Sequence, residues 1–168
     1  MSKKEKLLTE AMIFAEVSQF RQQQKTLILA SHSPGSPEAV QQPLASYAPF
    51  IEDEEGNIYL LLSGLASHSK NLKYHQDEQT KLSILLIEDE QSARNLFARK
   101  RLNYSCTVSV WSRDHPQWQE KIAEFKEKFG KTIDVLAGLG DFNLYCLTPV
   151  EGNYVRGFGQ AFELNLPN

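Results

Sequence analysis

Two short stretches of this 168-residue sequence combine residue types that can bind an anionic group. "RKR" (Arg99 to Arg101) supplies guanidinium groups, which bind phosphate or carboxylate through paired hydrogen bonds. "SGLASHSKN" (63 to 71) places Ser63, Ser67, His68 and Lys70 where an apolar run gives way to a polar segment, and hydroxyls beside a helix N-terminus attract anions. We interpret both stretches as candidate anion sites. A solvated basic turn and a serine-capped helix are the respective alternatives.

A third stretch, "RGFGQAF" (156 to 162), lies in the last expected strand. Gly157 and Gly159 within a strand indicate a bulge, or a backbone that a flat ligand or another chain approaches closely. A barrel corner is the alternative, because it can also require glycine. Arg156 and Phe158 would then offer a cation and an aromatic ring at the same place, and the three stretches together favour a binding site.

Metal and nucleotide motifs are not found in the sequence. The four histidines, His32, His68, His75 and His115, have neither the spacing of zinc ligands nor cysteines near them. "GFGQAF" is no dinucleotide fingerprint, because it has no third glycine and no helix is expected after it. A catalytic Ser/His/Asp set has candidates but no recognisable arrangement. We therefore expect no metal site and assign no catalytic side chain.

Composition and charge are those of an ordinary globular protein, with 41% hydrophobic residues, 23% charged residues and a net charge of −3. This balance gives no general attraction to nucleic acid or to an anionic membrane. No apolar run is long enough to span a bilayer or to serve as a signal peptide, so we expect a cytoplasmic protein. Cys106 and Cys146 lie in apolar runs and are expected to be buried free thiols, with a disulfide as the alternative.

Hydrophobic periodicity predicts a mainly β protein with flanking helices. Residues 101–112 alternate between apolar and polar side chains, as a strand with one core face does. Most expected strands are joined by short turns, which favours an antiparallel barrel in a single domain over residues 1–168, with an N-terminal helix over 1–24 and the barrel over 25–164. The expected strands are 26–31, 44–52, 58–63, 81–88, 101–112, 142–150 and 153–164, and the expected helical segments are 3–24, 66–77 (a helix or a loop), 92–100 and 114–140 with a break at Gly130.

Several strings of the sequence carry a family resemblance. "LASYAPF", "LLSGLASHSKNL", "LLIEDEQSARNLFARKRL", "FGKTIDVLAGLGDFNLYCLTP" and "RGFGQAF" resemble the haem-utilisation proteins of the HugZ/HutZ type. These proteins belong to the wider flavin-binding split-barrel group typified by pyridoxamine 5′-phosphate oxidase. The resemblance runs from about Phe20 to Phe162.

The resemblance implies a homodimeric split β-barrel with two equivalent sites at the subunit interface, without nucleic-acid or membrane partners. The site takes FMN in the wider group, whereas in the HugZ/HutZ branch it takes haem, which is cleaved oxidatively with a reductant and O2. By position, Thr26 would lie near the haem iron, Arg101 would contact the cofactor, His68 would be the loop histidine and Asp134 would support the proximal histidine. Arg156 and Phe158 lie in the matching terminal strand.

Two departures from these relatives keep alternatives open. Members of the haem branch supply an iron-binding histidine from a C-terminal tail, whereas this sequence has none after His115, so water, His68 or a partner-chain residue would have to replace it. The Ser-Arg-Lys string of the flavin oxidases is here Ser67-His68-Ser69, with Lys70 next.

Each cofactor has its own requirement. Haem needs an apolar slot with an arginine at its rim, for which Phe158, Tyr154 and Arg101 are candidates. FMN needs hydroxyls and cations at one end, for which the candidates are Ser63, Ser67, Lys70 and Arg99. The sequence therefore predicts a haem-binding, haem oxygenase-like enzyme, with a flavin-dependent oxidoreductase and a non-catalytic haem or flavin carrier as alternatives.

Overall fold

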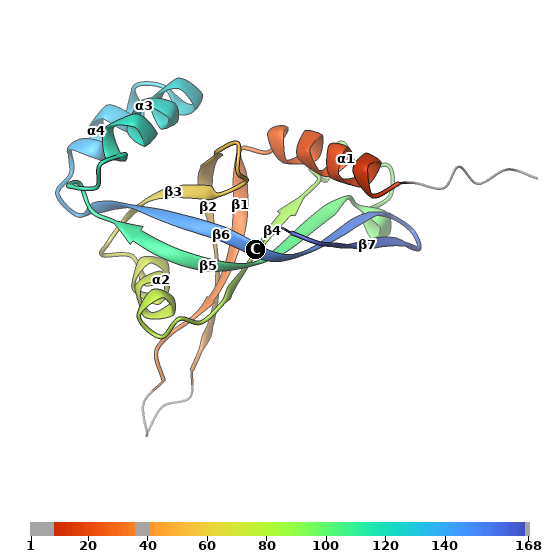
Figure 1. Ribbon diagram of the computed structural model, residues 1–168, viewed down its shortest axis with the longest axis horizontal. Coiled ribbons are helices and arrows are strands. Elements are labelled where there is room, and N and C mark those ends of the chain that lie inside the picture. Colours follow the sequence, from red (N-terminus) through yellow and green to blue (C-terminus); the bar gives the residue numbers. More distant parts are fainter. Residues whose placement is uncertain (1–8, 36–40, 167–168) are drawn as a thin grey trace, which may run out of the picture.

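Seven strands and four α-helices make up the computed structural model, which describes residues 9–35 and 41–166 (Figure 1). The part of the expected N-terminal helix before Thr9 lies outside the described residues. The strands are β1 (Thr26–His32), β2 (Pro43–Glu52), β3 (Ile58–Ser63), β4 (Leu82–Ile87), β5 (Arg101–Trp111), β6 (Phe142–Gly157) and β7 (Gln160–Leu164). The helices are α1 (Glu10–Gln22), α2 (Ser67–Asp77), α3 (Trp118–Phe129) and α4 (Thr132–Gly138), with a 3₁₀ turn over Leu96–Ala98.

The strands form one antiparallel sheet that closes on itself. Its order is β3-β2-β1-β4-β5-β6-β7, and β3 also pairs with β6, so the first six strands of this order form a ring. β7 extends the sheet beyond the ring by pairing with β6. The predicted antiparallel barrel with flanking helices is therefore confirmed.

Alternation of side chains gives the barrel a core face and an outer face. In β1, Leu27 and Leu29 are buried in the barrel while Ile28 between them points outward and is exposed. β3 is apolar and buried on both faces: Ile58, Leu60 and Leu62 enter the barrel, whereas its other side chains enter a second core beneath α3 and α4. That second core contains Tyr59, Leu61, Trp118, Phe125 and Ile133.

The helices lie outside the ring in three places (Figure 1). α1 buries Ile13, Val17 and Phe20 against the barrel core, and the Thr9 side chain caps it by accepting a hydrogen bond from the Met12 amide at 3.3 Å. α2 contacts β5 and β1, and α3 with α4 covers the outer side of β3. No helix in residues 9–35 and 41–166 is long and apolar enough to cross a bilayer.

Two element predictions need correction, and one alternative that the sequence left open is decided. Residues 92–100 form only a single 3₁₀ turn. The 66–77 segment is a helix, one of the two structures expected there. The break predicted between the strands 142–150 and 153–164 is wrong, because β6 runs unbroken from Phe142 to Gly157. A register shift opposite Ser105 and Cys106 marks a bulge near Pro149, which lets the strand accommodate a proline that has no amide hydrogen to donate.

The glycines of the terminal hairpin have a local explanation. Gly157 pairs with Gln160, so Phe158 and Gly159 form a two-residue turn, and Gly159 has φ 64°, which favours glycine. The predicted bulge is confirmed by a register shift at Arg156. Apart from the adjacent residues in the sequence, no described atom lies within 4 Å of a Cβ built at either glycine. Within the described chain, therefore, nothing approaches the backbone of these glycines closely.

Both cysteines are free and buried, as expected. Cys106 lies in the barrel core and Cys146 in the second core. Burial raises the pKa of the Cys106 thiol to about 12. A thiol with so high a pKa is not a nucleophile at neutral pH.

Gly152 packs closely against Tyr104 and Leu164, and its replacement by alanine is expected to destabilise the protein. A Cβ at this position would lie 2.8 Å from Cε1 of Tyr104 and 3.1 Å from Cδ1 of Leu164. Both neighbours are buried, so they have little room to move. We expect Gly152→Ala to lower the free energy of unfolding by about 1–3 kcal/mol, the usual cost of overpacking, measured by urea denaturation. Gly140→Ala is the control, since a Cβ there meets nothing within 4 Å; equal stabilities would contradict the packing argument.

Candidate functional site

The basic residues 99–101 lie where β5 begins, beside the end of β4. Arg99 turns back along its own loop, donating from Nε to the Glu88 carbonyl at 2.9 Å and from Nη1 to Glu90 Oε1 at 3.2 Å. Arg101 donates only to the carbonyl of Arg99, at 3.2 Å, and makes no ion pair with any described residue. Arg101 is therefore the guanidinium of this pair that keeps most of its hydrogen-bonding capacity for a ligand.

The terminal hairpin brings Arg156 and Phe158 to the same end of the sheet, because Arg101 pairs with Val155. Arg156 is held by Glu16 of α1, with Nε 3.0 Å from Oε2. Phe158 is 68% exposed in the turn. The prediction that Tyr154 lines an apolar slot is wrong, because this ring is completely buried and its hydroxyl donates to Glu16 Oε1 at 2.9 Å. Arg101, Arg156 and Phe158 thus gather at one end, which we call the basic end.

Ser63, Ser67, His68 and Lys70 lie at the opposite end of β6, where β3 finishes and α2 begins. The Ser63 hydroxyl donates to the carboxylate of Asp141, and its oxygen accepts from the Leu65 amide at 3.2 Å. Burial lowers the pKa of His68, so its imidazole favours the neutral form that can bind a metal ion. The structure separates these residues from Arg99, the fourth candidate for FMN, which lies at the basic end beside Glu88. The sequence analysis did not identify the Asp141 carboxylate beside Ser63.

Thr26 and Asp134 lie on other elements. Thr26 begins β1 and is exposed, and the registers of β1 with β4 and of β4 with β5 place it toward the Arg101 end of the outer face. Asp134 is on α4 and forms an ion pair with Lys126 at 2.8 Å.

The Lys128 ammonium donates to the carbonyls of Phe50 at 2.9 Å and Gln24 at 3.3 Å, so α3 is fixed to the start of β1.

The outer face of the sheet is apolar over β2, β1 and β4. Cross-strand neighbours Tyr47, Ile28 and Leu85 form one row across it, and Tyr47 is 69% exposed while Ile28 is 39% exposed. The flanking residues are also mostly small or apolar: Ala30, Ala45, Pro49 and Ile87. An apolar sheet face of this kind is typical of a protein interface.

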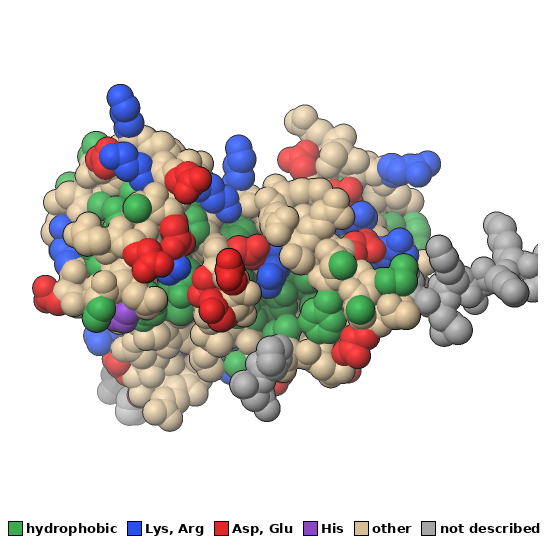
Figure 2. Space-filling view, turned by 45° about the horizontal axis from the view of Figure 1, so that its top comes forward, with side chains coloured by type: hydrophobic (Ala, Val, Ile, Leu, Met, Phe, Trp, Pro, Cys, Tyr) green, Lys and Arg blue, Asp and Glu red, His purple; other side chains and the backbone are tan. Residues whose placement is uncertain are grey.

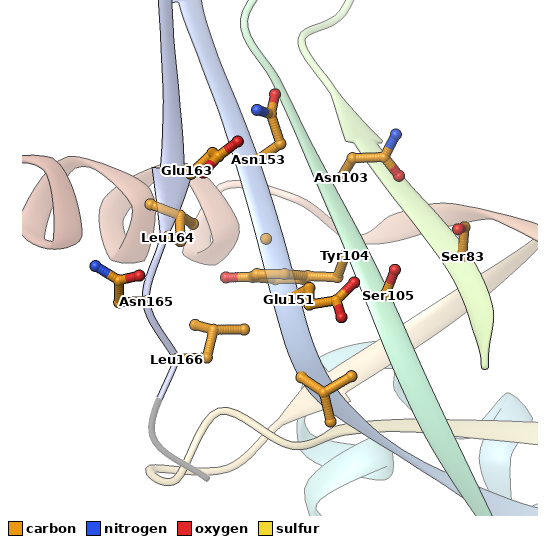
Figure 3. Close-up of a pocket in the computed structure, with 12 residues that line it drawn as sticks. Ser83, Asn103, Tyr104, Ser105, Glu151, Asn153, Glu163, Leu164, Asn165 and Leu166 are labelled. Atoms are coloured by element: carbon orange, nitrogen blue, oxygen red, sulfur yellow. The ribbon is translucent and has the colours of Figure 1, made fainter. Parts of the chain in front are cut away.

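Over β5 to β7 the same face becomes polar and holds a cavity of about 630 Å³ (Figure 3). Asn103, Asn153 and Glu163 are neighbours along its upper side, and Leu164, Asn165 and Leu166 line the cavity below Glu163 along the end of the chain. None of the residues predicted for the site lines it.

A second hollow, of about 600 Å³, lies between α1 and α3. It is lined mainly by carboxylates, those of Glu52, Asp53, Glu54, Glu55, Glu120 and Glu124. Figure 2 shows acidic side chains gathered on this side of the molecule. Carboxylates repel phosphate and haem propionates alike, so this hollow does not suit either cofactor.

A buried histidine fixes α2 to β1. The Nε2 atom of His75 accepts from the His32 amide at 3.4 Å, so Nδ1 carries the proton and donates to Thr80 Oγ1 at 2.8 Å. Burial, and secondarily the neighbouring His32, lower the pKa of His75. Its protonation would make both ring nitrogens donors and break the bond from His32.

Stability is therefore expected to fall as the pH drops below about 6.5, the ordinary histidine pKa, because the unfolded chain then binds a proton that folded His75 resists. His75→Gln, which can still accept and donate, should make the melting temperature less dependent on pH between 7 and 5. His68, whose pKa is also lowered, accounts for part of the slope that remains. An unchanged slope in the variant would contradict this role.

Comparisons with known proteins agree with this architecture. Residues 13–156 match the pyridoxamine 5′-phosphate oxidase family. The chain belongs to this family. It is 42% identical over 150 residues to haem oxygenase HutZ of Vibrio cholerae, covering 89% of this chain and 80% of that protein.

Solved structures give the same result. The crystal structure of HutZ, described as the haem storage protein from Vibrio cholerae, matches with a TM-score of 0.69 and 36% identity over 92% of this chain and 97% of that one. Campylobacter jejuni ChuZ matches with a TM-score of 0.79 and 27% identity over 92% of this chain and 60% of its own. The resemblance to the HugZ/HutZ branch is therefore confirmed.

Proposed function

We propose that this chain binds haem and degrades it oxidatively as a haem oxygenase-like enzyme. The observation that carries the proposal is Arg101, a guanidinium that pairs with no carboxylate of the described residues, at the end of the sheet where the Phe158 ring is exposed. Haem presents a flat apolar ring and two carboxylates, which match an exposed aromatic side chain and a free guanidinium fork. The 42% identity to a protein named haem oxygenase supports the same assignment.

Four side chains would hold the cofactor, at a site that two chains share. Arg101 would bind a propionate, and Phe158 would cover part of the ring. His68 would offer a neutral imidazole to the iron, since burial lowers the pKa of its imidazole. Thr26 presents a hydroxyl on the outer face. When bound, the haem iron supplies the redox chemistry with O2 and an external reductant, and these protein groups bind and orient it.

Arg99, Arg156 and Asp134 would have supporting roles. The backbone carbonyl of Arg99 accepts a hydrogen bond from the Arg101 guanidinium and so helps to position it. Arg156 fixes the terminal hairpin to α1 through Glu16. Asp134 is a candidate partner for a histidine that binds iron, once it leaves its exposed ion pair with Lys126. Each exposed ion pair of this kind contributes little to stability, so it is easily exchanged.

We propose further that the protein is a homodimer whose two sites each use both chains. In one chain, Arg101 and the α2 end are separated by the length of β5, about 35 Å for eleven residues at a rise of ~3.3 Å. A two-fold axis through the apolar outer face would bring the basic end of one chain toward α2 of its partner. Burial of Ile28 and Tyr47 would supply the driving force.

We also propose the domain organisation, compartment and partners of the protein. It is a single-domain cytoplasmic protein that acts on a small molecule, without nucleic-acid or membrane partners. A haem carrier is the second candidate, favoured by the description of the HutZ structure as a storage protein.

Reaction with a reductant distinguishes the two functions. The haemin complex is mixed with ascorbate in air, with catalase present to remove free peroxide, and its Soret absorbance is followed. A protein-dependent loss of the Soret band with formation of a bile-pigment spectrum supports the enzyme. A Soret band that persists would exclude the proposed activity under these conditions and would support the haem carrier instead.

A further inference from the structure

The start of α2 has the hydrogen-bond donors of a phosphate site. Beside them lies a carboxylate, which would repel a phosphate. The backbone amides of the first turn, the Ser63 and Ser67 hydroxyls and Lys70 belong to one short stretch. Such a group could accept the dianionic phosphate of FMN. The Asp141 carboxylate, however, is hydrogen-bonded to Ser63.

This hydrogen bond removes Ser63 from phosphate binding. A serine hydroxyl has one proton, and that of Ser63 goes to Asp141. Its oxygen also accepts from the Leu65 amide at 3.2 Å. A phosphate could therefore gain no hydrogen bond from Ser63 unless Asp141 withdrew, and it would meet a second anion within about 5–6 Å, the length of two hydrogen bonds sharing one oxygen.

The position of Asp141 is fixed by the backbone on both sides. Its carbonyl accepts from the Gly64 amide at 2.6 Å and from the Asn143 side-chain amide at 3.3 Å. The next residue, Phe142, pairs with Ser63 in the β3–β6 ladder. Asp141 forms no ion pair within 4.0 Å in the described part of the chain, so its charge is not neutralised by Lys70 or another cation.

We propose that Asp141 is a specificity-determining residue, which keeps phosphate, and with it FMN, from the start of α2. The FMN phosphate therefore does not fit at the start of α2, although the hydroxyls there suit it. The inference concerns α2 alone and does not depend on whether haem is degraded.

Flavin titration of three proteins tests the inference. Wild type, Asp141→Asn and Asp141→Ala are titrated with FMN, followed by quenching of flavin fluorescence, with thermal unfolding as a check on folding. Asparagine removes the charge, and alanine also releases the Ser63 hydroxyl. We expect both variants to bind FMN at least tenfold more tightly than wild type, with inorganic phosphate as a competitor. Ser63→Ala in the Asp141→Ala protein should reverse part of the gain.

Two controls make the result specific. Riboflavin lacks the phosphate and should gain nothing in either variant. Asp77→Asn removes the same charge at the other end of α2 and should bind FMN as wild type does. Tight FMN binding by wild type, equal gains for riboflavin, or no gain in a folded Asp141→Ala protein would overturn the inference. Haemin titration of the same proteins is separate: failure of all of them to bind haemin would refute the proposed function and leave the FMN result standing.

Discussion

Replacing Arg101 by alanine is expected to weaken haemin binding at least tenfold. Arg101 is the guanidinium of the basic end that makes no ion pair in residues 9–35 and 41–166, and its one hydrogen bond goes to a backbone carbonyl. A charge-assisted hydrogen bond to a carboxylate contributes about 1.5–3 kcal/mol, and 1.4 kcal/mol corresponds to a factor of ten. The dissociation constant is measured from the Soret absorbance during titration of the purified variant.

Two further variants separate geometry from charge. Arg101→Lys keeps the charge but loses the planar fork, so we expect an intermediate affinity. Lys73→Ala removes one exposed cation from α2, away from the basic end, and should leave the affinity unchanged. Wild-type affinity in Arg101→Ala would show that the propionates are bound elsewhere, and the site would have to be reassigned.

Ile28→Glu is expected to convert the proposed homodimer to a monomer and to lower haemin affinity by at least a hundredfold. Ile28 lies between Tyr47 and Leu85 in the central row of the apolar outer face. Two glutamates placed near a two-fold axis would repel each other and remain without a partner in a buried interface. If each site uses both chains, loss of the dimer also removes half of the site. Molar mass is measured by light scattering after size-exclusion chromatography.

Met12→Glu provides the matched control for this prediction. Met12 is exposed to a similar degree, 44% against 39% for Ile28, but it lies on α1. This variant should keep the mass and the haemin affinity of wild type. A dimeric Ile28→Glu protein would place the interface elsewhere. A monomer that still binds haemin tightly would contradict a site shared between two chains.

The barrel could be predicted because its strands alternate clearly between apolar and polar residues. The strand over 101–112 is one residue shorter in the structure, and its inward side chains Leu102, Tyr104 and Cys106 are all buried. The break after Gly130 also has a local cause, since glycine there adopts φ 78° at the end of α3. These features depend on nearest neighbours in the sequence.

The error in β6 arises from tertiary structure. Pro149 and Gly152 have the composition of a turn, and nothing local distinguishes a turn from a bulge in a long strand. Pairing with β5 on one side and with β3 or β7 on the other keeps the strand intact. The expected strand 153–164 also includes the turn at Phe158 and Gly159, although a glycine is itself a turn signal.

The sequence suggests residues for the candidate site but does not predict their arrangement. That Arg101 and Phe158 share one end follows from the β5–β6 register, which is a long-range property. The prediction for Tyr154 is wrong because the alternation of side chains along a strand defines two faces but does not show which of them is buried. Asp141 carried no sequence signal at all, since its contact with Ser63 joins residues 78 positions apart.

Parallel titration of the purified protein with haemin and with FMN tests the central claim most directly. We predict a stoichiometric shift of the Soret band with haemin and no tight binding of FMN, because Arg101 is free to bind a propionate while Asp141 occupies the Ser63 hydroxyl. Tight FMN binding without a specific haemin spectrum would contradict the proposal. It would assign the protein to flavin chemistry and leave its similarity to haem oxygenase HutZ as one of ancestry.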